Sequence, residues 1–562
     1  MKIIENILKK IFFETVEKSY GKEIAEKVYI QETNNSVFGD YQTNFAMITS
    51  KDLRQAPRKT AESLIQNIQN NEIIEKLEIA GPGFINIYLK KEFLIEMLLK
   101  VENEKYDFEI NTDGEVIIDY SSPNIAKEMH IGHLRSTIIG DSIKKIMQFM
   151  GYKVIGDNHI GDWGTQFGKL IVAYKNWLDE NNYKENAIDE LERLYVLFSQ
   201  KAEEDDSLNT LAKDELKKLQ DGDEENTRLW KEFVSVSLEE YDKVYKRLGI
   251  HFDTYNGESF YHDLMKEVID LMEEKKLVKE SEGALVVEFD EKDNLPTCIV
   301  RKSNKSFLYT TSDIACIKYR RENYNINKLV YVTDQRQQMH FKQVFKIAEM
   351  LGFNEEKAHV YFGLMRFADG VFSTRKGNVI KLKELLDKAK EKALEILKER
   401  NSTGNLEEKA EIIGMGAVKY ADLSQNRTSD IIFEWDKILS FSSNSSPYLQ
   451  YTYARINSLT KKSQVEIKEE IKDLQTDFEI NLAKMIVKFP SAILKAAESY
   501  KPNVLSDYLY NLAQTFNSFY NNVPVLKSEE DELNTRIYLC SKTARIIKKG
   551  LELLGIKTLE EM

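Results

Sequence analysis

Cysteine is scarce in this chain, and its distribution excludes two common roles. Among 562 residues there are three cysteines: Cys298, Cys316 and Cys540. They lie far apart and form no Cys-x-x-Cys pair, so the sequence indicates neither a zinc ribbon nor a disulfide framework. Thiols that stay reduced are typical of the cytoplasm, and we expect the protein there.

Long apolar runs are also missing. No stretch approaches the ~20 apolar residues that a membrane-spanning helix needs, so no membrane partner is expected. The N-terminal segment MKIIENILKKIFFETVEK is interrupted by Glu5, Lys9, Lys10 and Glu14. It therefore predicts an amphipathic helix and not a signal peptide.

An excess of positive charge, the usual mark of a nucleic-acid-binding protein, is absent too, because the net charge is −13. The distribution of charge matters more than its sum. Residues 201–226 hold ten acids and four lysines, which account for −6 of the total. The segment 541–557 is basic, with Glu552 opposed by Lys542, Arg545, Lys548, Lys549 and Lys557. On charge alone, a basic binding face and a solvated helix surface stay equally open.

The length predicts about three or four domains at roughly 150 residues each, and the pattern along the chain changes twice. Residues 1–108 predict a small α+β unit, with helices over 2–19 and 57–70 and strands around the Gly81-Pro82-Gly83 turn. Residues 109–424 predict an α/β unit, and residues 425–562 an all-α bundle. No internal repeat at a fixed period is found.

The middle unit carries the signs of a parallel sheet. EVIIDYS, from residue 115, and YKVIGDN, from residue 152, read as buried strands on either side of a helix over 129–150. This βαβ pattern predicts a right-handed crossover in an open α/β sheet, and KLVYVTD near residue 330 predicts a further strand. A mainly acidic, helical insertion is expected around 175–300.

The most informative segment runs from Asp119 to Ser136, DYSSPNIAKEMHIGHLRS. A strand ends, a polar loop follows, and a helix begins near His130 and His133. Helix N-termini suit phosphate, and two imidazoles three residues apart lie on one side of the first turn. Gly132 between them has no side chain, so a flat adenine ring fits against the backbone.

His-x-Gly-His alone has other interpretations. The histidines are also compatible with a simple helix start or with half of a metal site. Metal-binding pairs on a helix usually stand at i, i+4 with an acidic partner, and no third ligand is evident here. The same tetrapeptide occurs in other nucleotidylyl-transferring enzymes.

The longer segment SSPNIAKEMHIGHLRSTIIGD resembles the signature of the arginyl-tRNA synthetases, a class I family. Further segments also resemble that family along most of the chain: GPGFINIYL, HIGDWGTQFG, YVTDQRQQMHFKQVF, FSTRKGN and SPYLQYTYARI. The resemblance implies a Rossmann-type catalytic domain with a helical insertion, a small N-terminal tRNA-binding α+β domain and a C-terminal all-α anticodon-binding bundle. It implies a ligase that activates arginine with ATP and transfers it to tRNA.

The resemblance also implies an arginine site. A guanidinium is a planar cation that needs carboxylates and neutral acceptors, and Asp119 and Asp313 are candidates. Tyr309 lies four residues before Asp313, on the same face of a helix. The family's pocket further corresponds to Gln337, to His133 and to the 122–127 loop, in which Ser122 is a candidate and Asn124 would hold the substrate's α-amino or carboxylate end.

The second class I signature, typically KMSKS, lacks its lysines here. Val371 and Thr374 stand where the two lysines are usual, while Arg375 and Lys376 lie nearby. Many members of the family share this difference, and a lysine shortly before the first motif is thought to compensate; Lys127 occupies that position. We therefore expect Lys127 at the α-phosphate and Arg375 or Lys376 at the pyrophosphate, with His130, Gly132 and His133 also binding ATP.

For tRNA, the resemblance places Phe84 and Asn86 at the D-loop. It places four residues near the anticodon: Asn444, Tyr448, Tyr451 and Arg455. Mg²⁺ is expected to accompany ATP, a protein-bound structural metal is not expected, and the chain is expected to act as a monomer. A non-catalytic tRNA-binding relative and another His-x-Gly-His nucleotidylyltransferase are the alternatives.

The role of Lys127 gives a first prediction. Lys127→Ala removes a charge that would stabilise the transition state, so kcat for adenylate formation should fall by about 10²-fold or more. Pre-steady-state or exchange kinetics measure it directly. A near-normal kcat would remove Lys127 from the catalytic assignment.

Overall fold

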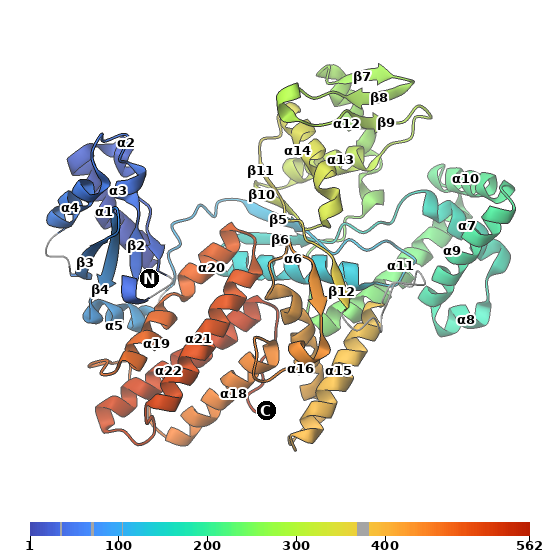
Figure 1. Cartoon of the computed structure of the whole chain (residues 1–562). Coiled ribbons are helices and arrows are strands. Elements are labelled where there is room, and N and C mark those ends of the chain that lie inside the picture. Colours follow the sequence, from blue (N-terminus) through green and yellow to red (C-terminus); the bar gives the residue numbers. More distant parts are fainter. Residues whose placement is uncertain (34–35, 69–71, 104, 368–380) are drawn as a thin grey trace.

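The computed structural model describes residues 1–33, 36–68, 72–103, 105–367 and 381–562. Its elements form four regions (Figure 1). They are a small N-terminal unit, a central parallel sheet, an insertion that extends to one side of the sheet, and a helical C-terminal bundle.

The N-terminal unit packs helices against an antiparallel sheet of order β1-β2-β4-β3. The expected turn at residues 81–83 connects β3 to β4, and the predicted N-terminal helix is α1. The elements are α1 (Ile4–Tyr20), α2 (Lys22–Ala25), β1 (Gln31–Glu32), β2 (Tyr41–Thr43), α3 (Phe45–Ile48), α4 (Pro57–Asn67), β3 (Ile74–Ala80), β4 (Phe84–Leu89) and α5 (Lys91–Lys100).

The central sheet has the order β11-β10-β5-β6, and every neighbouring pair is parallel. The predicted βαβ unit is therefore confirmed, with α6 as its crossover helix. Asp119 pairs in register with Asp157 on one side and with Tyr331 on the other, so three strands end level. The elements are β5 (Glu115–Asp119), α6 (Ile131–Met150), β6 (Lys153–Asp157), α13 (Tyr309–Asn323), β10 (Ile326–Tyr331), α14 (Gln338–Met350) and β11 (Glu356–His359).

The insertion after β6 is helical up to residue 248, as predicted from the acidic stretch. Its helices are α7 (Thr165–Trp177), α8 (Glu180–Glu185), α9 (Ala187–Glu204), α10 (Ser207–Gln220) and α11 (Glu224–Leu248). The helical insertion was expected to extend to about residue 300, which is wrong beyond residue 248. The chain there adds a small region with a three-stranded antiparallel sheet, which the sequence patterns did not indicate. This region contains η2 (Glu258–Tyr261), α12 (Leu264–Glu274), β7 (Val278–Ser281), β8 (Ala284–Val287), η3 (Glu291–Asp293) and β9 (Cys298–Arg301).

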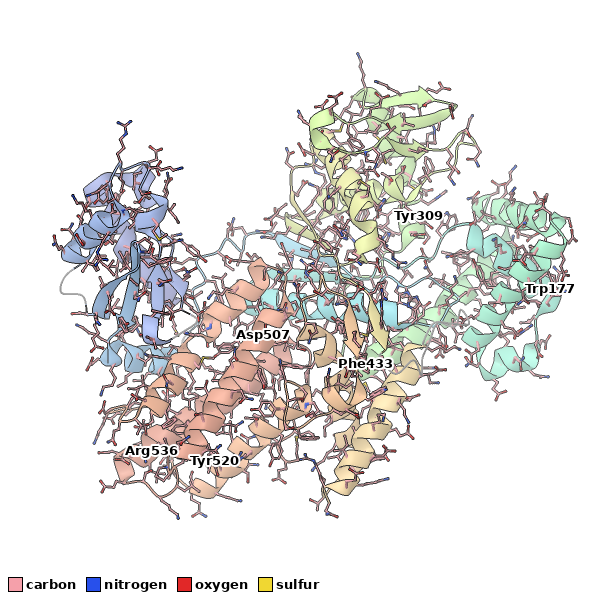
Figure 2. All side chains as sticks on the ribbon, viewed as in Figure 1. Trp177, Tyr309, Phe433, Asp507, Tyr520 and Arg536 are labelled. Atoms are coloured by element: carbon pink, nitrogen blue, oxygen red, sulfur yellow. The ribbon has the colours of Figure 1, made fainter. Side chains whose placement is uncertain are left out.

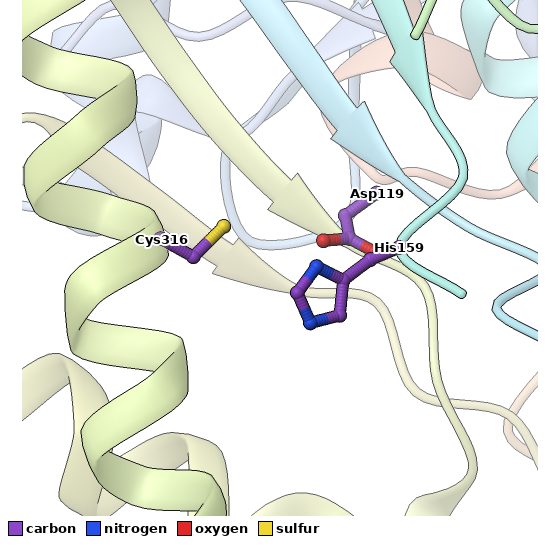
Figure 3. Close-up of side chains that lie close together, drawn as sticks. All are labelled: Asp119, His159 and Cys316. Atoms are coloured by element: carbon purple, nitrogen blue, oxygen red, sulfur yellow. The ribbon is translucent and has the colours of Figure 1, made fainter. Parts of the chain in front are cut away.

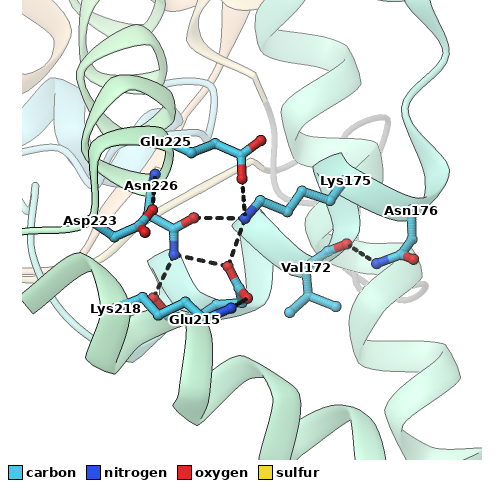
Figure 4. Close-up of polar contacts among 8 residues, drawn as sticks. All are labelled: Val172, Lys175, Asn176, Glu215, Lys218, Asp223, Glu225 and Asn226. Atoms are coloured by element: carbon cyan, nitrogen blue, oxygen red, sulfur yellow. Dashed lines mark hydrogen bonds and ion pairs between the residues drawn. The ribbon is translucent and has the colours of Figure 1, made fainter.

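Some acidic side chains of residues 201–226 form contacts within the insertion (Figure 4). Lys175 of α7 lies 2.8 Å from Glu215 of α10 and 2.9 Å from Glu225 at the start of α11. The buried Asn226 accepts a hydrogen bond from Lys175 and donates one to the Glu215 backbone carbonyl. These contacts join three helices, so these two carboxylates act as structural partners of a lysine and are not free for ligands.

The C-terminal region is almost wholly helical, as expected. One short strand interrupts it, β13 (Ile431–Phe433), which pairs in parallel with β12 (Met365–Phe367). The helices are α15 (Leu382–Glu399), α16 (Leu406–Leu423), α17 (Trp435–Ile438), α18 (Ser446–Ser463), α19 (Asp477–Val487), α20 (Phe489–Glu498), α21 (Pro502–Asn522) and α22 (Glu530–Leu553).

Lysines of this bundle hold the N-terminal unit. Lys484 lies 2.6 Å from Asp40, Lys488 lies 2.9 Å from Glu32, and Lys495 contacts Glu32 at 2.5 Å. The N-terminal unit accordingly lies beside α19 and α20, although 360 or more residues separate them in sequence (Figure 1).

The basic segment near the C-terminus is partly turned inward. Lys542 is 2% exposed and donates to the Val101 backbone carbonyl at 2.6 Å and to Asn103 at 2.9 Å. Lys549 pairs with Glu552. The segment thus contributes to packing as well as to surface charge. Among the described residues, no helix combines the length and apolar character that a membrane span requires.

Candidate active site

The loop that follows β5 has an unusual backbone. Ser121, Ser122 and Ala126 have φ values of +77°, +49° and +61°, a region that non-glycine residues rarely adopt. Each such residue costs about 1–3 kcal/mol and persists only where its surroundings enforce it. The loop lies at the carboxyl end of a central strand, where open α/β sheets bind their ligands.

One face of α11 enforces this conformation. Ser237 Oγ accepts the Ala126 N–H at 2.9 Å, and Tyr241 Oη donates to the carbonyls of Asn124 and Lys127 at 2.6 and 2.9 Å. Tyr245 Oη, four residues further on, lies 2.8 Å from Ser121 Oγ. This clamp was not predicted from the sequence, although hydroxyl residues at i, i+4 and i+8 of a helix were a visible signal.

The two signature histidines cap α6 in a reciprocal way. His130 Nδ1 accepts the Gly132 N–H at 3.0 Å, and His133 Nδ1 accepts the His130 N–H at 3.1 Å. Their rings lie 3.8 Å apart between centroids. A Cβ at position 132 would meet the His130 ring at 2.8 Å, so the close approach of the ring requires glycine.

This capping fixes the protonation of both rings. Burial, and then the nearby His130 and Lys127, lower the pKa of His133 to about 3. Burial and Lys127 also lower the pKa of His130. Because each Nδ1 accepts a hydrogen bond, the single proton of each neutral ring resides on Nε2. The pair therefore presents two neutral N–H donors at the N-terminus of a helix, an arrangement suited to phosphate oxygens.

Lys127 lies beside this pair. Its Nζ is 4.5 Å from the centroid of the Tyr195 ring of α9, a cation–π contact with the insertion. Its backbone carbonyl is held by Tyr241. The insertion thus contacts both the backbone and the side chain of the lysine that the sequence singled out. Arg375 and Lys376, the other predicted cations, lie outside the described residues.

Asp119 is already engaged within the chain. Arg320 of α13, 2% exposed, donates to Asp119 Oδ2 and to Asp157 Oδ2 at 2.7 Å each. The other oxygen, Oδ1, accepts from Ser122 Oγ at 3.3 Å and retains capacity for a further donor. Asp119, which was predicted to bind the guanidinium of the substrate, therefore already binds the guanidinium of Arg320.

Asp119, His159 and Cys316 converge at this point (Figure 3), and one ligand atom from each lies within 4.8 Å of the others. Burial raises the pKa of the Cys316 thiol, which therefore stays protonated, whereas a metal would need the thiolate. Arg320 also balances the charge of Asp119. The trio consequently fits a packed polar interior better than a metal centre.

The other predicted arginine ligands lie on α13 and before α14. Asp313 accepts from His340 Nε2 at 2.5 Å. Burial alone would lower the pKa of His340, but the hydrogen bond and charge of Asp313 raise it. Tyr309 lies one turn earlier, at the N-terminal end of α13, and is 71% exposed (Figure 2). Gln337 is exposed at the end of η4 (Gln335–Gln337).

Glu258 is an acidic group near these residues that sequence analysis missed. Burial raises its pKa to about 7; His159 opposes the rise, whereas Asp313 and Asp162 add to it. Glu258 also acts, after burial, to raise the pKa of Tyr309. The residues around Tyr309 and Asp313 thus form an acidic environment, in which a bound cation would favour the charged carboxylate.

A pocket of about 540 Å³ opens beside Tyr309 and Glu258. Its wall combines aromatic side chains with two lysines: Trp163, His262, Phe307, Lys302 and Lys305. Trp163 and His262 have ring centroids 5.1 Å apart. Aromatic faces for stacking and lysines for phosphate are the usual means of binding single-stranded nucleic acid.

Asn124 is exposed in the loop, and its backbone forms a bridge with Gly161. A Cβ at Gly161 would meet Asn124 Oδ1 at 2.2 Å, so a side chain there would displace the amide of Asn124. In the N-terminal unit, Phe84 is partly buried, whereas Asn86 is 2% exposed and accepts from Gln42 Nε2 at 2.7 Å. Asn86 thus lies in the sheet with its amide oxygen already bonded.

The predicted anticodon residues differ in exposure. Tyr451 is 39% exposed on α18, whereas Tyr448 is 7% exposed and accepts from Asn517. Asn444 accepts from the Tyr420 hydroxyl at 2.7 Å. The guanidinium of Arg455 lies 4.3 Å from the centroid of the Tyr520 ring, which is labelled in Figure 2.

Known protein families match three consecutive parts of the chain. Residues 2–89 match the arginyl tRNA synthetase N terminal domain, and residues 95–435 match the catalytic domain of tRNA synthetases class I (R). Residues 449–562 match the DALR anticodon binding domain.

Individual relatives give the same result. The chain is 55% identical to an arginine–tRNA ligase of Fusobacterium nucleatum over 100% of both chains. It is 40% identical to that of Alkaliphilus metalliredigens over 94% of each chain. Among solved structures it is similar to the arginyl-tRNA synthetase of Plasmodium falciparum, with a TM-score of 0.86, 33% identity and 100% coverage of both chains.

The capping geometry predicts how the histidine pair titrates. Because their pKa values are lowered, His130 and His133 should stay neutral, with the proton on Nε2, as the pH falls to the range in which an ordinary imidazole becomes protonated. Their contribution to the free energy of unfolding should be complete above about pH 6.5 and decrease on acidification below it.

Nitrogen-15 NMR of the imidazoles, assigned with His130→Asn and His133→Asn, measures this directly. His340, whose pKa is raised, serves as the internal contrast and should titrate above its ordinary value. A midpoint near 6.5 for either signature histidine would contradict the inference that burial keeps its ring neutral.

Proposed function

The chain belongs to the arginyl-tRNA synthetases, and we propose that it joins arginine to its tRNA with ATP through the site at the carboxyl ends of β5 and β10. The proposal rests on one observation: two kinds of binding group lie at the same edge of the sheet. Neutral imidazole donors at the start of α6 suit a triphosphate, and the acidic groups around α13 suit a guanidinium.

ATP would lie over the N-terminus of α6. His130 and His133 donate Nε2–H groups to phosphate oxygens, and Gly132 leaves room for the adenine ring. Lys127 supplies the positive charge that the neutral histidines do not, opposite the α-phosphate. Arg375 and Lys376 would bind the leaving pyrophosphate. Mg²⁺ enters with ATP as part of the substrate, and we propose no resident metal.

Arginine would lie between the loop and α13. Asp313, held by His340, would accept two guanidinium N–H groups, with Tyr309, Gln337 and the free capacity of Asp119 Oδ1 completing the planar set. Asn124 and Ser122 would hold the α-amino and carboxylate end. Other amino acids would leave these acceptors without the guanidinium that they are arranged to bind, so strong selection needs no editing site.

The reaction has two steps. A carboxylate oxygen of arginine attacks the α-phosphorus, the bond to the bridging oxygen breaks, and pyrophosphate leaves with its electron pair. A ribose hydroxyl at the tRNA 3′ end then attacks the arginyl carbonyl, AMP leaves, and the hydroxyl proton is released. Catalysis is positioning and charge stabilisation, without a covalent enzyme intermediate.

The pocket beside Tyr309 would receive the tRNA 3′ end, with its bases on Trp163 or Phe307 and its phosphates on Lys302 and Lys305. The D-loop would meet the surface near Phe84 and Asn86. The anticodon would meet α18 near Tyr451 and Arg455, with Asn444 and Tyr448 positioning that helix. We propose that the chain acts as a monomer, in the cytoplasm with the rest of translation.

The arginine pocket predicts a selective defect. Asp313→Asn keeps the shape of the side chain but removes its charge, so KM for arginine should rise by about 10- to 100-fold, while KM for ATP stays near normal. Steady-state exchange kinetics provide both constants. Asp293→Asn is the matched control, since Asp293 pairs with Lys346 outside the pocket. An unchanged KM for arginine would remove Asp313 from the pocket.

The proposed function itself is tested by ATP–pyrophosphate exchange with each of the twenty amino acids, with and without total tRNA. The resemblance to the arginyl-tRNA synthetases implies that arginine is activated only when tRNA is bound. We therefore expect exchange with arginine alone and only when tRNA is present. Exchange with a different substrate would favour another His-x-Gly-His nucleotidylyltransferase. Tight tRNA binding without any exchange would identify a non-catalytic relative.

A further inference from the structure

Two arginines that this reaction does not use, Arg135 and Arg427, lie between the catalytic helix α6 and the C-terminal bundle. Arg135 is 1% exposed and stands two residues after His133. Its Nε and Nη2 donate to the two oxygens of the buried Asp422, at 2.8 and 3.2 Å. This bidentate pair fixes α6 against the end of α16.

The remaining donors of Arg135 reach backbone carbonyls. Nη1 donates to Gly363 at 2.6 Å and to Ser429 at 3.3 Å, and Nη2 donates to the Arg427 carbonyl at 3.3 Å. Gly363 lies two residues before β12, and Ser429 lies two residues before β13. A Cβ at Gly363 would meet the Ser429 carbonyl at 2.7 Å, so the segments that lead into β12 and β13 lie close together.

Arg427 extends these contacts into the bundle. Its Nε donates to the carbonyl of Tyr500 at 2.9 Å, between α20 and α21. Its Nη1 donates to the Tyr361 carbonyl, and its guanidinium lies 5.4 Å from the centroid of the Tyr361 ring. Within the described part of the chain no carboxylate pairs with Arg427, so a cation is held here by two carbonyls and an aromatic face.

The contacts form one continuous path. It leads from the turn between α20 and α21, through the side chain and then the carbonyl of Arg427, to Arg135 on the first turns of α6. Each link is a directional hydrogen bond in a partly buried place, where leaving a polar group unpaired is costly. The elements at both ends are packed helices, which move as units.

We infer that Arg427 and Arg135 form a relay through which tRNA bound to the C-terminal bundle positions α6 and the β12–β13 pair for adenylate formation. The inference rests on the proposed function and adds two positioning residues to it. The relay affects the rate of the chemical step and leaves the binding of each substrate unchanged.

Arg427→Met tests the inference, because it keeps an unbranched side chain against Tyr361 and removes both carbonyl contacts. With saturating tRNA, arginine-dependent ATP–pyrophosphate exchange should slow by about 10-fold, while tRNA Kd and both KM values change by less than about 2-fold. Arg427→Lys retains the charge but can satisfy fewer carbonyls, so it should restore part of the rate.

Arg321→Met is the matched control. Arg321 also lies over an aromatic ring, 4.6 Å from the Phe353 centroid, but it pairs with Glu355 and contacts neither α6 nor the bundle. It should exchange at the parent rate. A parent rate for Arg427→Met, or a defect confined to tRNA Kd, would overturn the relay, as would an equal loss in Arg321→Met.

If Arg427→Met does not fold, as judged by its thermal melt, Arg427→Lys decides the question. A slower exchange with unchanged tRNA Kd supports the relay, and a parent rate overturns it. Parent enzyme that exchanges equally fast without tRNA would overturn the relay but leave the proposed function intact. Parent enzyme that shows no exchange would instead overturn the proposed function itself.

Discussion

The site depends on the conformation of the loop between β5 and α6. Three of its non-glycine residues adopt positive φ, and each of these costs more than a single hydrogen bond returns. The hydroxyls of Ser237, Tyr241 and Tyr245 supply several bonds from one rigid helix and so hold the loop as a set. The insertion is therefore part of the proposed active site and not an accessory to it.

Charge is separated within this small region. The buried guanidinium groups of Arg135 and Arg320 each face carboxylates, and burial keeps the two capping histidines neutral. The phosphate side consequently has neutral donors and one lysine, Lys127. The opposite side is rich in carboxyl groups: Asp313, which pairs with His340, and Glu258, whose pKa is raised by burial. A triphosphate and a guanidinium therefore each have one favourable side.

The sequence predicted the parts that depend on local pattern. The βαβ unit, the helix that begins near His130 and the turn at residues 81–83 each follow from apolar periodicity or from glycine and proline close in sequence. The clamp from α11 and the Arg320 pair could not be predicted in the same way, because they join residues more than 100 positions apart. The sequence also did not predict that Asn86, Tyr448 and Lys542 are buried. Their polar side chains are typical of a surface, but here they form hydrogen bonds within the fold.

The spacing of the α11 hydroxyls has a consequence for the length of the chain. One residue advances a helix by about 100°, so adding or deleting a single position between Ser237 and Tyr245 would turn one of these hydroxyls away from the loop. The turns between α7 and α10 carry no such contact with the loop and can vary in length without that effect. Across related chains, we therefore expect insertions and deletions in the outer turns. We expect the number of residues between the positions of Ser237 and Tyr245 in α11 to stay constant.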